Sequence, residues 1–221
     1  MKTKKETLEI IDLLSEHYGE YKCGLEFKSP FELLIATILS AQCTDERVNI
    51  VTKKLFAVAN TPSQILELGE SKLHEYIKSC GLSNTKAKNI MKTCFTLCND
   101  YDEEVPSTME ELIKLNGVGR KTANVVMSNA FGIPAIAVDT HVQRVSNRIG
   151  LAKSDDVLKT EETLMKKIPK EYWSDAHHWI IWHGRKICNA RNPKCNECML
   201  NSLCDFYKKN QKNKTEKTCN A

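Results

Sequence analysis

The sequence has 221 residues, 41% of them hydrophobic, which is enough chain to build one large domain or two small ones around a real core. Its formal charge of +4 excludes a histone-like protein, yet it permits a local basic patch that binds duplex nucleic acid with salt-sensitive affinity. No stretch is apolar for long enough to span a membrane, so we expect no membrane association.

Capping signals divide the chain into a succession of helices. Serine, threonine or aspartate precedes most of the apolar periodic runs, twice with proline at the first helical position. The expected helices cover Thr7–Tyr18, a central buried run opened by Ser29, Thr44 to about Ala57, Thr61 to about Leu68, Ser71 to Gly81, Lys86–Cys98, a short helix from Ser107, a helix from Arg120, His141–Ile149, Ser154–Ile168 and Glu171–Gly184. No alternating strand is found, so we expect an all-α fold. The lysine-rich residues 208–221 are expected to form a disordered basic tail.

The most distinctive stretch of the chain is LNGVG, at residues 115–119. A short helical pattern ends at Leu115, because the two glycines permit positive φ and leave no side chain to block a close approach. A second helix begins at Arg120, so the stretch predicts two helices joined by a tight hairpin. The amides of Gly117, Val118 and Gly119 and the free N–H groups of the second helix then point at one spot, which suits a phosphate.

Two side chains near this hairpin have the chemistry of a catalytic pair. Lys121 lies in the first turn of the second hairpin helix, where the positive end of the helix dipole disfavours a charged ammonium. Asp139 follows the apolar run 136–138 and is placed to cap the helix His141–Ile149. An amine, a carboxylate and a phosphate grip predict a site for chemistry on nucleic acid. The alternative is a non-catalytic DNA-binding hairpin with a structural metal cluster, but that module has no use for the carboxylate.

The segments LNGVGRKTANVV and VDTHVQRV resemble the helix-hairpin-helix DNA glycosylases, and among them the endonuclease III family. The resemblance extends from about Ile10 to Tyr207. It implies a two-lobed helix-hairpin-helix glycosylase fold, with a helical-barrel domain at residues 23–133 that contains the hairpin at about 108–131. Residues 1–22 and 134–207 would form an iron–sulfur domain, with the active site in the cleft between the lobes. One departure is Asn116, where the family usually has proline.

The resemblance also implies an activity. The family's enzymes are bifunctional DNA glycosylases and AP lyases of base excision repair, and they act as monomers on duplex DNA that contains oxidised pyrimidines or abasic sites. The matching residues imply that Lys121 is the nucleophile, which forms a Schiff base, and that Asp139 is its catalytic partner. Adenine-mismatch glycosylases of the same fold generally lack this lysine, so its presence favours the lyase, which breaks the strand on the 3′ side by β-elimination.

Four of the ten cysteines, Cys188, Cys195, Cys198 and Cys204, follow the spacing C-x6-C-x2-C-x5-C. The N-terminal run MKTKKETLEIIDLLSE lacks the apolar region of a signal peptide, so we expect a cytoplasmic, nucleoid-associated protein in a reducing compartment. There these four thiols are metal ligands rather than disulfides. By spacing alone, zinc and an iron–sulfur cluster fit about equally well. The resemblance implies a [4Fe–4S] cluster with a structural and DNA-positioning role.

An enzyme that cleaves a glycosidic bond in duplex DNA must flip out the nucleotide and fill the gap. The resemblance implies that Gln42, in the segment LSAQCTD, plugs this gap and that Leu82, in GLSN, wedges the opposite strand. Without the resemblance, Gln42 would simply occupy a helix–helix turn and Leu82 would fold back onto the core. Both residues are therefore DNA-contact predictions that depend on the family.

Several basic residues are further candidates for contacts with DNA. Arg144 and Arg148 lie one helical turn apart and either face the duplex or form a surface ion-pair face. Arg191 and Lys194 lie between the first two cysteines of the cluster and are expected to meet phosphates. His141, just after the candidate carboxylate, is a possible accessory group for proton transfer or phosphate contact, although a histidine in a first helical turn is more often a structural hydrogen-bonding group.

Overall fold

The computed structural model describes residues 1–219, with side chains described as far as Lys212. These residues form helices joined by turns and loops, and none of them lies in a β-strand. The predicted all-α fold is confirmed. Within the same range, no helix is long and apolar enough to cross a membrane.

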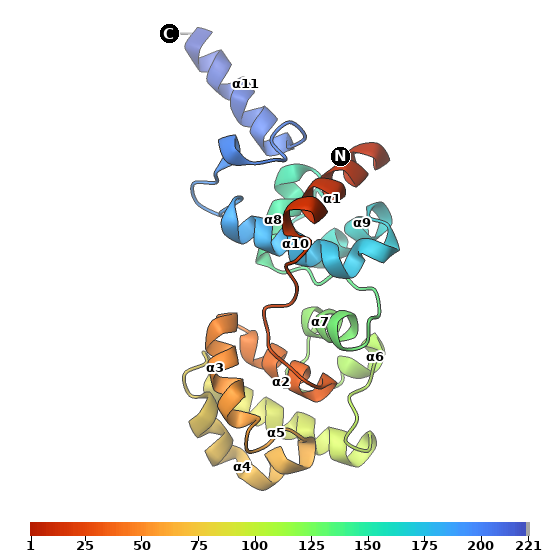
Figure 1. The fold of residues 1–221 in the computed structure, drawn as a ribbon, viewed down its shortest axis with the longest axis vertical. Coiled ribbons are helices and arrows are strands. Elements are labelled where there is room, and N and C mark those ends of the chain that lie inside the picture. The colour runs from red at the N-terminus through yellow and green to blue at the C-terminus, as the bar shows by residue number, and fades with distance from the viewer. Residues whose placement is uncertain (220–221) are drawn as a thin grey trace. The chain divides into compact units, whose positions relative to one another are not determined.

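The chain divides into two compact units. One unit is Cys23–Ala135, and the other combines Met1–Lys22 with the residues from Ile136 onward. Figure 1 follows this division by colour, since the red N-terminal helix α1 packs with the cyan and blue helices of the second half of the chain. The N-terminal segment therefore folds with residues far away from it in the sequence.

Helix α2 (Pro30–Ser40) is the central helix of the unit Cys23–Ala135. Ser29 caps it by accepting a hydrogen bond from the Glu32 amide at 3.1 Å, and its residues 31–39 are all buried. It packs against α3 (Asp45–Leu55), α5 (Ser83–Asp100) and α7 (Arg120–Ala130), which explains why its sequence is apolar nearly all round. The unit also contains α4 (Pro62–Ile77) and the short α6 (Met109–Leu112).

Helix α4 is interrupted at Gly69, whose φ of 79° and ψ of 156° are not helical. Only glycine adopts such a conformation without steric cost, since it has no Cβ. The predicted end of one helix at Leu68 and start of another at Ser71 are therefore confirmed as a break within α4. Helix α4 packs against α5, so the chain reverses direction at the turn between these two helices.

The other unit is built from α1 (Lys4–Tyr18), α8 (Thr140–Ile149), α9 (Val157–Lys167) and α10 (Trp173–Lys186). Fully buried side chains from all four of these helices meet in one core, among them Ile10, Val142, Leu164 and Ile180. Two short 3-10 helices, Lys170–Tyr172 and Cys195–Glu197, lie before α10 and in the cysteine-containing loop. This core gives α8, which follows Asp139, a fixed position within its unit.

Helix α11 (Asp205–Cys219) departs from the disordered tail that the sequence suggested from residue 208. Its first turn is anchored, because Lys2 Nζ donates to Asp205 at 2.5 Å and the Arg148 guanidinium lies 4.8 Å from the Phe206 ring centroid. Lysine, glutamine and glutamate favour helix, so a helix that has been nucleated at a packed turn continues. Residues 220–221 of the expected tail lie outside the described residues.

Candidate functional site

The hairpin between α6 and α7 is shaped by Gly117. Its φ is 78°, and a Cβ at this position would lie 3.1 Å from the Asn89 side chain, so both the backbone and the packing require glycine. Thr93 Oγ1 donates to the Asn116 carbonyl at 2.8 Å. This bond fixes the entry to the turn at Asn116.

The hairpin leaves backbone amides available for an anion. Gly119 is the N-cap of α7, and in the described structure no side chain caps this helix. A Cβ at Gly119 would meet nothing within 4 Å. Val118 has a different role, because its N–H donates to the Leu115 carbonyl at 3.2 Å and its side chain is buried. The uncapped amides of the hairpin therefore lie at Gly119 and in the first turn of α7, which is the arrangement expected for binding an anion.

Lys121 is the second residue of α7 and its side chain is exposed. The ion pairs found among the described residues do not include it. The opposite face of α7 is held in place, since Ala123 and Val126 are fully buried and the helix packs against α2. The Lys121 amine is therefore attached to a rigid helix, and none of its N–H groups donates to another described residue.

Asp139 caps α8, as the sequence predicts. Its Oδ1 accepts hydrogen bonds from the amides of His141 and Val142, both at 2.8 Å. The described residues provide no hydrogen bond to Oδ2. One carboxylate oxygen is thus committed to the helix, while the other remains available for a proton or for a positively charged group.

His141 is half-buried and directed at Arg144. The His141 Nδ1 and Arg144 Nη2 atoms lie 3.1 Å apart, and because a guanidinium nitrogen only donates, Nδ1 is the acceptor. Burial lowers the pKa of His141, with the Asp139 carboxylate acting in the opposite direction. The ring is therefore held neutral, and Nδ1 is not a source of protons.

The two arginines of α8 point inward. Arg144 donates to the carbonyls of Cys188 and Gly184, and Arg148 donates to the carbonyls of Asn189 and Ala190 at 2.7 and 3.0 Å. Both guanidinium groups therefore bind backbone carbonyls in the last turn of α10 or just after it. This placement matches neither the expected face toward DNA nor a surface ion-pair face, because a guanidinium supplies a fan of donors that suits the free carbonyls at a helix end.

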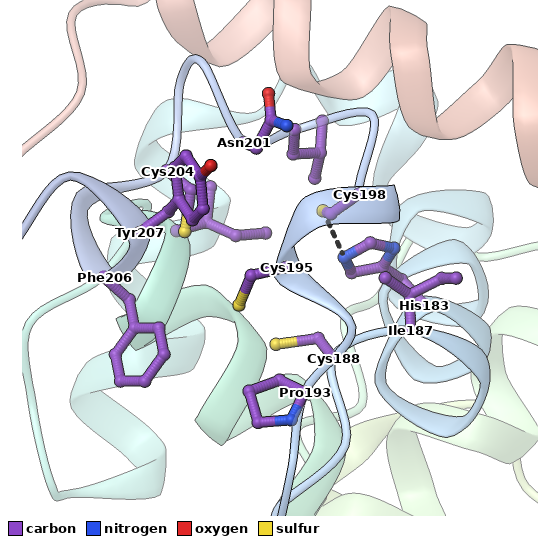
Figure 2. A pocket seen from close by; sticks show the side chains of 12 residues that line it. His183, Ile187, Cys188, Pro193, Cys195, Cys198, Asn201, Cys204, Phe206 and Tyr207 are labelled. Atoms are coloured by element: carbon purple, nitrogen blue, oxygen red, sulfur yellow. Dashed lines mark hydrogen bonds between the residues drawn. The ribbon is translucent and has the colours of Figure 1, made fainter. Parts of the chain in front are cut away.

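Cys188, Cys195, Cys198 and Cys204 line one pocket, whose empty volume is ≈ 340 Å³. Figure 2 shows the sulfur atoms of Cys188 and Cys195 directed into the same space, and Cys198 beside His183, with its Sγ 3.5 Å from Nε2. The pKa of Cys198 is raised to about 11, chiefly by burial and also by the other three cysteines, while a hydrogen bond from the Leu200 backbone acts in the opposite direction. The four predicted ligands are thus brought together on one pocket.

These four thiols are spread around the pocket rather than gathered at a point. Among the described side chains, no three histidine, cysteine or acidic groups are close enough to hold a single metal ion. The described cysteines form no disulfide with one another. Arg191 and Lys194, between the first two cysteines, are exposed.

Gln42 and Leu82 occupy two turns of the unit Cys23–Ala135 that touch each other. Both have left-handed backbone conformations, with φ of 54° and 59°, and both side chains are exposed. A Cβ at Gly81 would lie 2.9 Å from the Gln42 carbonyl oxygen, so the two turns are in direct contact. The structure therefore brings the two expected DNA probes side by side.

Lys86 is a residue that sequence reasoning missed. It is only 4% exposed, and its Nζ donates to the carbonyls of Leu39 and Ala41, which lie just before the Gln42 turn. Its partners lie far away in the sequence, and its position within an amphipathic helix is the only signal that could have indicated burial.

Comparisons with known proteins agree with this geometry. Residues 35–170 match the family model of the HhH-GPD superfamily base excision DNA repair proteins. Endonuclease III of Haemophilus influenzae is 53% identical over 208 residues, which cover 94% of this chain and 98% of that enzyme.

Two solved structures resemble the whole fold. One is a non-covalent complex of endonuclease III with DNA, and the other is a trapped covalent intermediate of endonuclease III with DNA. Each has a TM-score of 0.91 and 50% sequence identity, and each match covers 96% of this chain and 100% of the other.

Proposed function

Because the chain belongs to the endonuclease III family of the HhH-GPD superfamily of base excision DNA repair proteins, we propose that it is a bifunctional DNA glycosylase and AP lyase that acts on oxidised pyrimidines in duplex DNA. The observation that carries this proposal is the match along nearly the whole chain to an enzyme trapped in covalent linkage with DNA. A covalent link to DNA requires a nucleophile on the protein.

In this proposal the nucleophile is Lys121. Its neutral amine attacks C1′ of the flipped nucleotide, so that the N–C1′ bond forms and the glycosidic bond to the damaged base breaks. The C1′–O4′ bond then breaks, with its electron pair going to O4′, so that the opened sugar is joined to the lysine through a Schiff base. This Schiff base acidifies the C2′ proton, and loss of this proton eliminates the 3′ phosphate. The exposed position on α7 and the uncommitted donors support this role.

Asp139 is proposed as the catalytic partner. Its Oδ2 accepts the proton that the amine releases, and the negative charge stabilises the positive charge that develops on the sugar. The two amide bonds to Oδ1 orient the carboxylate for this task. Lys121 and Asp139 belong to different units of the chain, so the reaction requires both to reach the same nucleotide.

The hairpin is proposed to hold a phosphate of the damaged strand. Gly119 keeps the backbone accessible, Gly117 permits the tight turn, and Val118 anchors the turn in the core. Gln42 and Leu82 are proposed to fill and wedge the gap in the duplex, while Arg191 and Lys194 contact phosphates from the cysteine loop. These contacts make duplex DNA with damaged pyrimidines or abasic sites the partner.

The similarity of the chain to endonuclease III indicates a metal centre in the cysteine loop, and we propose that this centre is a [4Fe–4S] cluster. A single zinc ion would require four sulfurs at about 2.3 Å from one centre. Four thiols spread around one pocket suit a larger, multinuclear group better. When bound, the cluster cross-links the loop and fixes its basic residues. Equal amounts of iron and acid-labile sulfide in the purified protein are expected, whereas zinc would contradict this assignment.

The proposed domains divide the functional residues between two parts of the chain. Residues 23–133 form a helical-barrel domain that carries the hairpin and the DNA probes. Residues 1–22 and 134–207 form the domain that carries the carboxylate and the metal loop.

The test of the function is strand cleavage at a single abasic site. Lys121→Gln removes the amine from an exposed position and is expected to abolish nicking while it leaves DNA binding intact. Lys159→Gln, at another exposed lysine on α9, is the matched control and should nick like the wild type. A Lys121→Gln protein that nicks at the wild-type rate would contradict the proposal. If the wild type binds the duplex but never nicks it, the protein is instead a non-catalytic DNA-binding module.

A further inference from the structure

A buried lysine lies beneath the two probe turns. Lys86 on α5 is 4% exposed, and its Nζ donates to Leu39 O at 2.7 Å and to Ala41 O at 2.6 Å. The ion pairs among the described residues do not include Lys86. Burying an ammonium group without a carboxylate partner is unfavourable, so the two hydrogen bonds to backbone carbonyls must compensate for the lost hydration.

The end of α2 explains what these donors do. Ala41 follows the helix with φ of −58° and ψ of 117°, so the helical backbone stops there. The Cys43 amide donates to the Ser40 carbonyl at 3.1 Å, which leaves the carbonyls of Leu39 and Ala41 to other donors. The last turn of α2 contains no basic residue. Lys86 supplies both the missing donors and a positive charge at the negative end of the helix dipole.

The same residue also fixes the second turn. The Lys86 amide donates to the Leu82 carbonyl at 3.0 Å, which closes the first turn of α5. Through its side chain and its amide, Lys86 is therefore bonded to both turns. Gly81 completes the assembly, since a Cβ there would lie 2.9 Å from the Gln42 carbonyl oxygen.

Both turns are held in conformations that their residues rarely adopt. Gln42 and Leu82 have φ of 54° and 59°, and Leu82 is 56% exposed although it is apolar. A left-handed backbone at a residue other than glycine persists only where the surroundings enforce it. The bonds from Lys86 and the contact at Gly81 supply that enforcement.

We propose that Lys86 is a positioning residue that holds the turns of Gln42 and Leu82 together as one rigid wedge, which keeps the duplex open during base flipping. This inference rests on the proposed function and deepens it. The wedge matters for a duplex, where a base must be unstacked and its partner strand held apart. It does not matter for a single strand, in which the abasic sugar is already accessible.

This difference provides the test. Borohydride trapping is measured under single-turnover conditions on one oligonucleotide with an abasic site, both as a duplex and as a single strand. Lys86→Met is expected to slow trapping on the duplex about tenfold or more and to leave trapping on the single strand within about twofold of wild type. Lys86→Arg keeps a cation and several donors, so it should restore part of the duplex rate. Lys72→Met, at an exposed lysine on α4, is the control for lost charge.

Equal losses on both substrates would mean a merely structural role and would overturn the inference. Should Lys86→Met fail to fold, Gly81→Ala provides the same test, because its Cβ displaces the Gln42 carbonyl. An unchanged duplex rate in Gly81→Ala would also overturn the inference. A wild-type protein that traps neither substrate would overturn the proposed function itself, whereas selective loss on the duplex supports both.

Discussion

Arg144 donates to the carbonyl of Cys188 through both Nε, at 3.2 Å, and Nη2, at 3.1 Å. Arg144 belongs to α8, the helix that Asp139 caps, and Cys188 is the first cysteine of the metal loop. Within one unit, the proposed catalytic carboxylate and the metal loop are therefore fixed to the same helix. A change in the loop should be transmitted to the carboxylate through this helix.

The first prediction separates structural arginines from DNA-binding ones. Arg144→Met removes charge-assisted hydrogen bonds to two carbonyls and should lower the free energy of unfolding by about 2 kcal/mol. The slope of log affinity against log salt should stay unchanged, because no phosphate contact is lost. Arg191→Ala should do the opposite, with unchanged unfolding and a slope smaller by about 1. A reduced slope with wild-type stability in Arg144→Met would make it a DNA contact.

The second prediction concerns the two functions of Asp139. Asparagine also caps helices, so Asp139→Asn should retain wild-type stability while single-turnover base release becomes much slower. Asp139→Ala should lose both properties, with a free energy of unfolding lower by about 1 kcal/mol. Thermal unfolding and rapid-quench assays measure the two effects. Unchanged base release in Asp139→Asn would rule out its role as the catalytic partner.

The third prediction uses the two hairpin glycines as a matched pair. Gly117→Ala should lower the free energy of unfolding by about 1–2 kcal/mol, because its φ is 78° and the new Cβ meets Asn89. Gly119→Ala should leave stability unchanged, since nothing lies near the new Cβ. Both should weaken duplex binding, Gly119→Ala because its methyl group obstructs the approach of a phosphate and Gly117→Ala because the distorted turn no longer directs the hairpin amides at one spot. Normal binding by Gly119→Ala would show that the phosphate lies elsewhere.

The fourth prediction is a pH dependence from His141. Burial lowers the pKa of His141 in the folded state, so the unfolded chain binds the proton more tightly. The neutral ring therefore stabilises the fold above the unfolded pKa near 6.5, and this contribution is lost as the pH falls through the lower folded pKa. Denaturant unfolding between pH 7 and pH 5 should show less loss of stability in His141→Gln than in the wild type. Equal losses would remove His141 as the cause.

Local signals predicted the helices well because a cap and the run it begins are close in the sequence. The residues Ser29, Thr44, Thr61, Thr108 and Asp139 all cap helices through their side chains. The helix start at Arg120 and the break at Gly69 are also local features. The identification of the endonuclease III family from the hairpin, the aspartate segment and the cysteine spacing is confirmed by the comparisons.

Features that depend on distant partners were not predictable. Arg144 and Arg148 share one helical face, but nothing in α8 indicates that the carbonyls after α10 will cover that face. The burial of Lys86 depends in the same way on the end of α2. The helical conformation after Lys208 follows from the anchoring of Asp205 and Phe206, which a composition argument does not include.

The measurement that tests the central claim most directly is borohydride trapping on a duplex that contains one thymine glycol, with an abasic duplex in parallel. We expect a covalent protein–DNA adduct on both duplexes, and none on either with Lys121→Gln. This result would establish the Schiff base and the pyrimidine substrate together. The absence of an adduct on both duplexes, with tight binding retained, would contradict the assignment of a glycosylase and lyase.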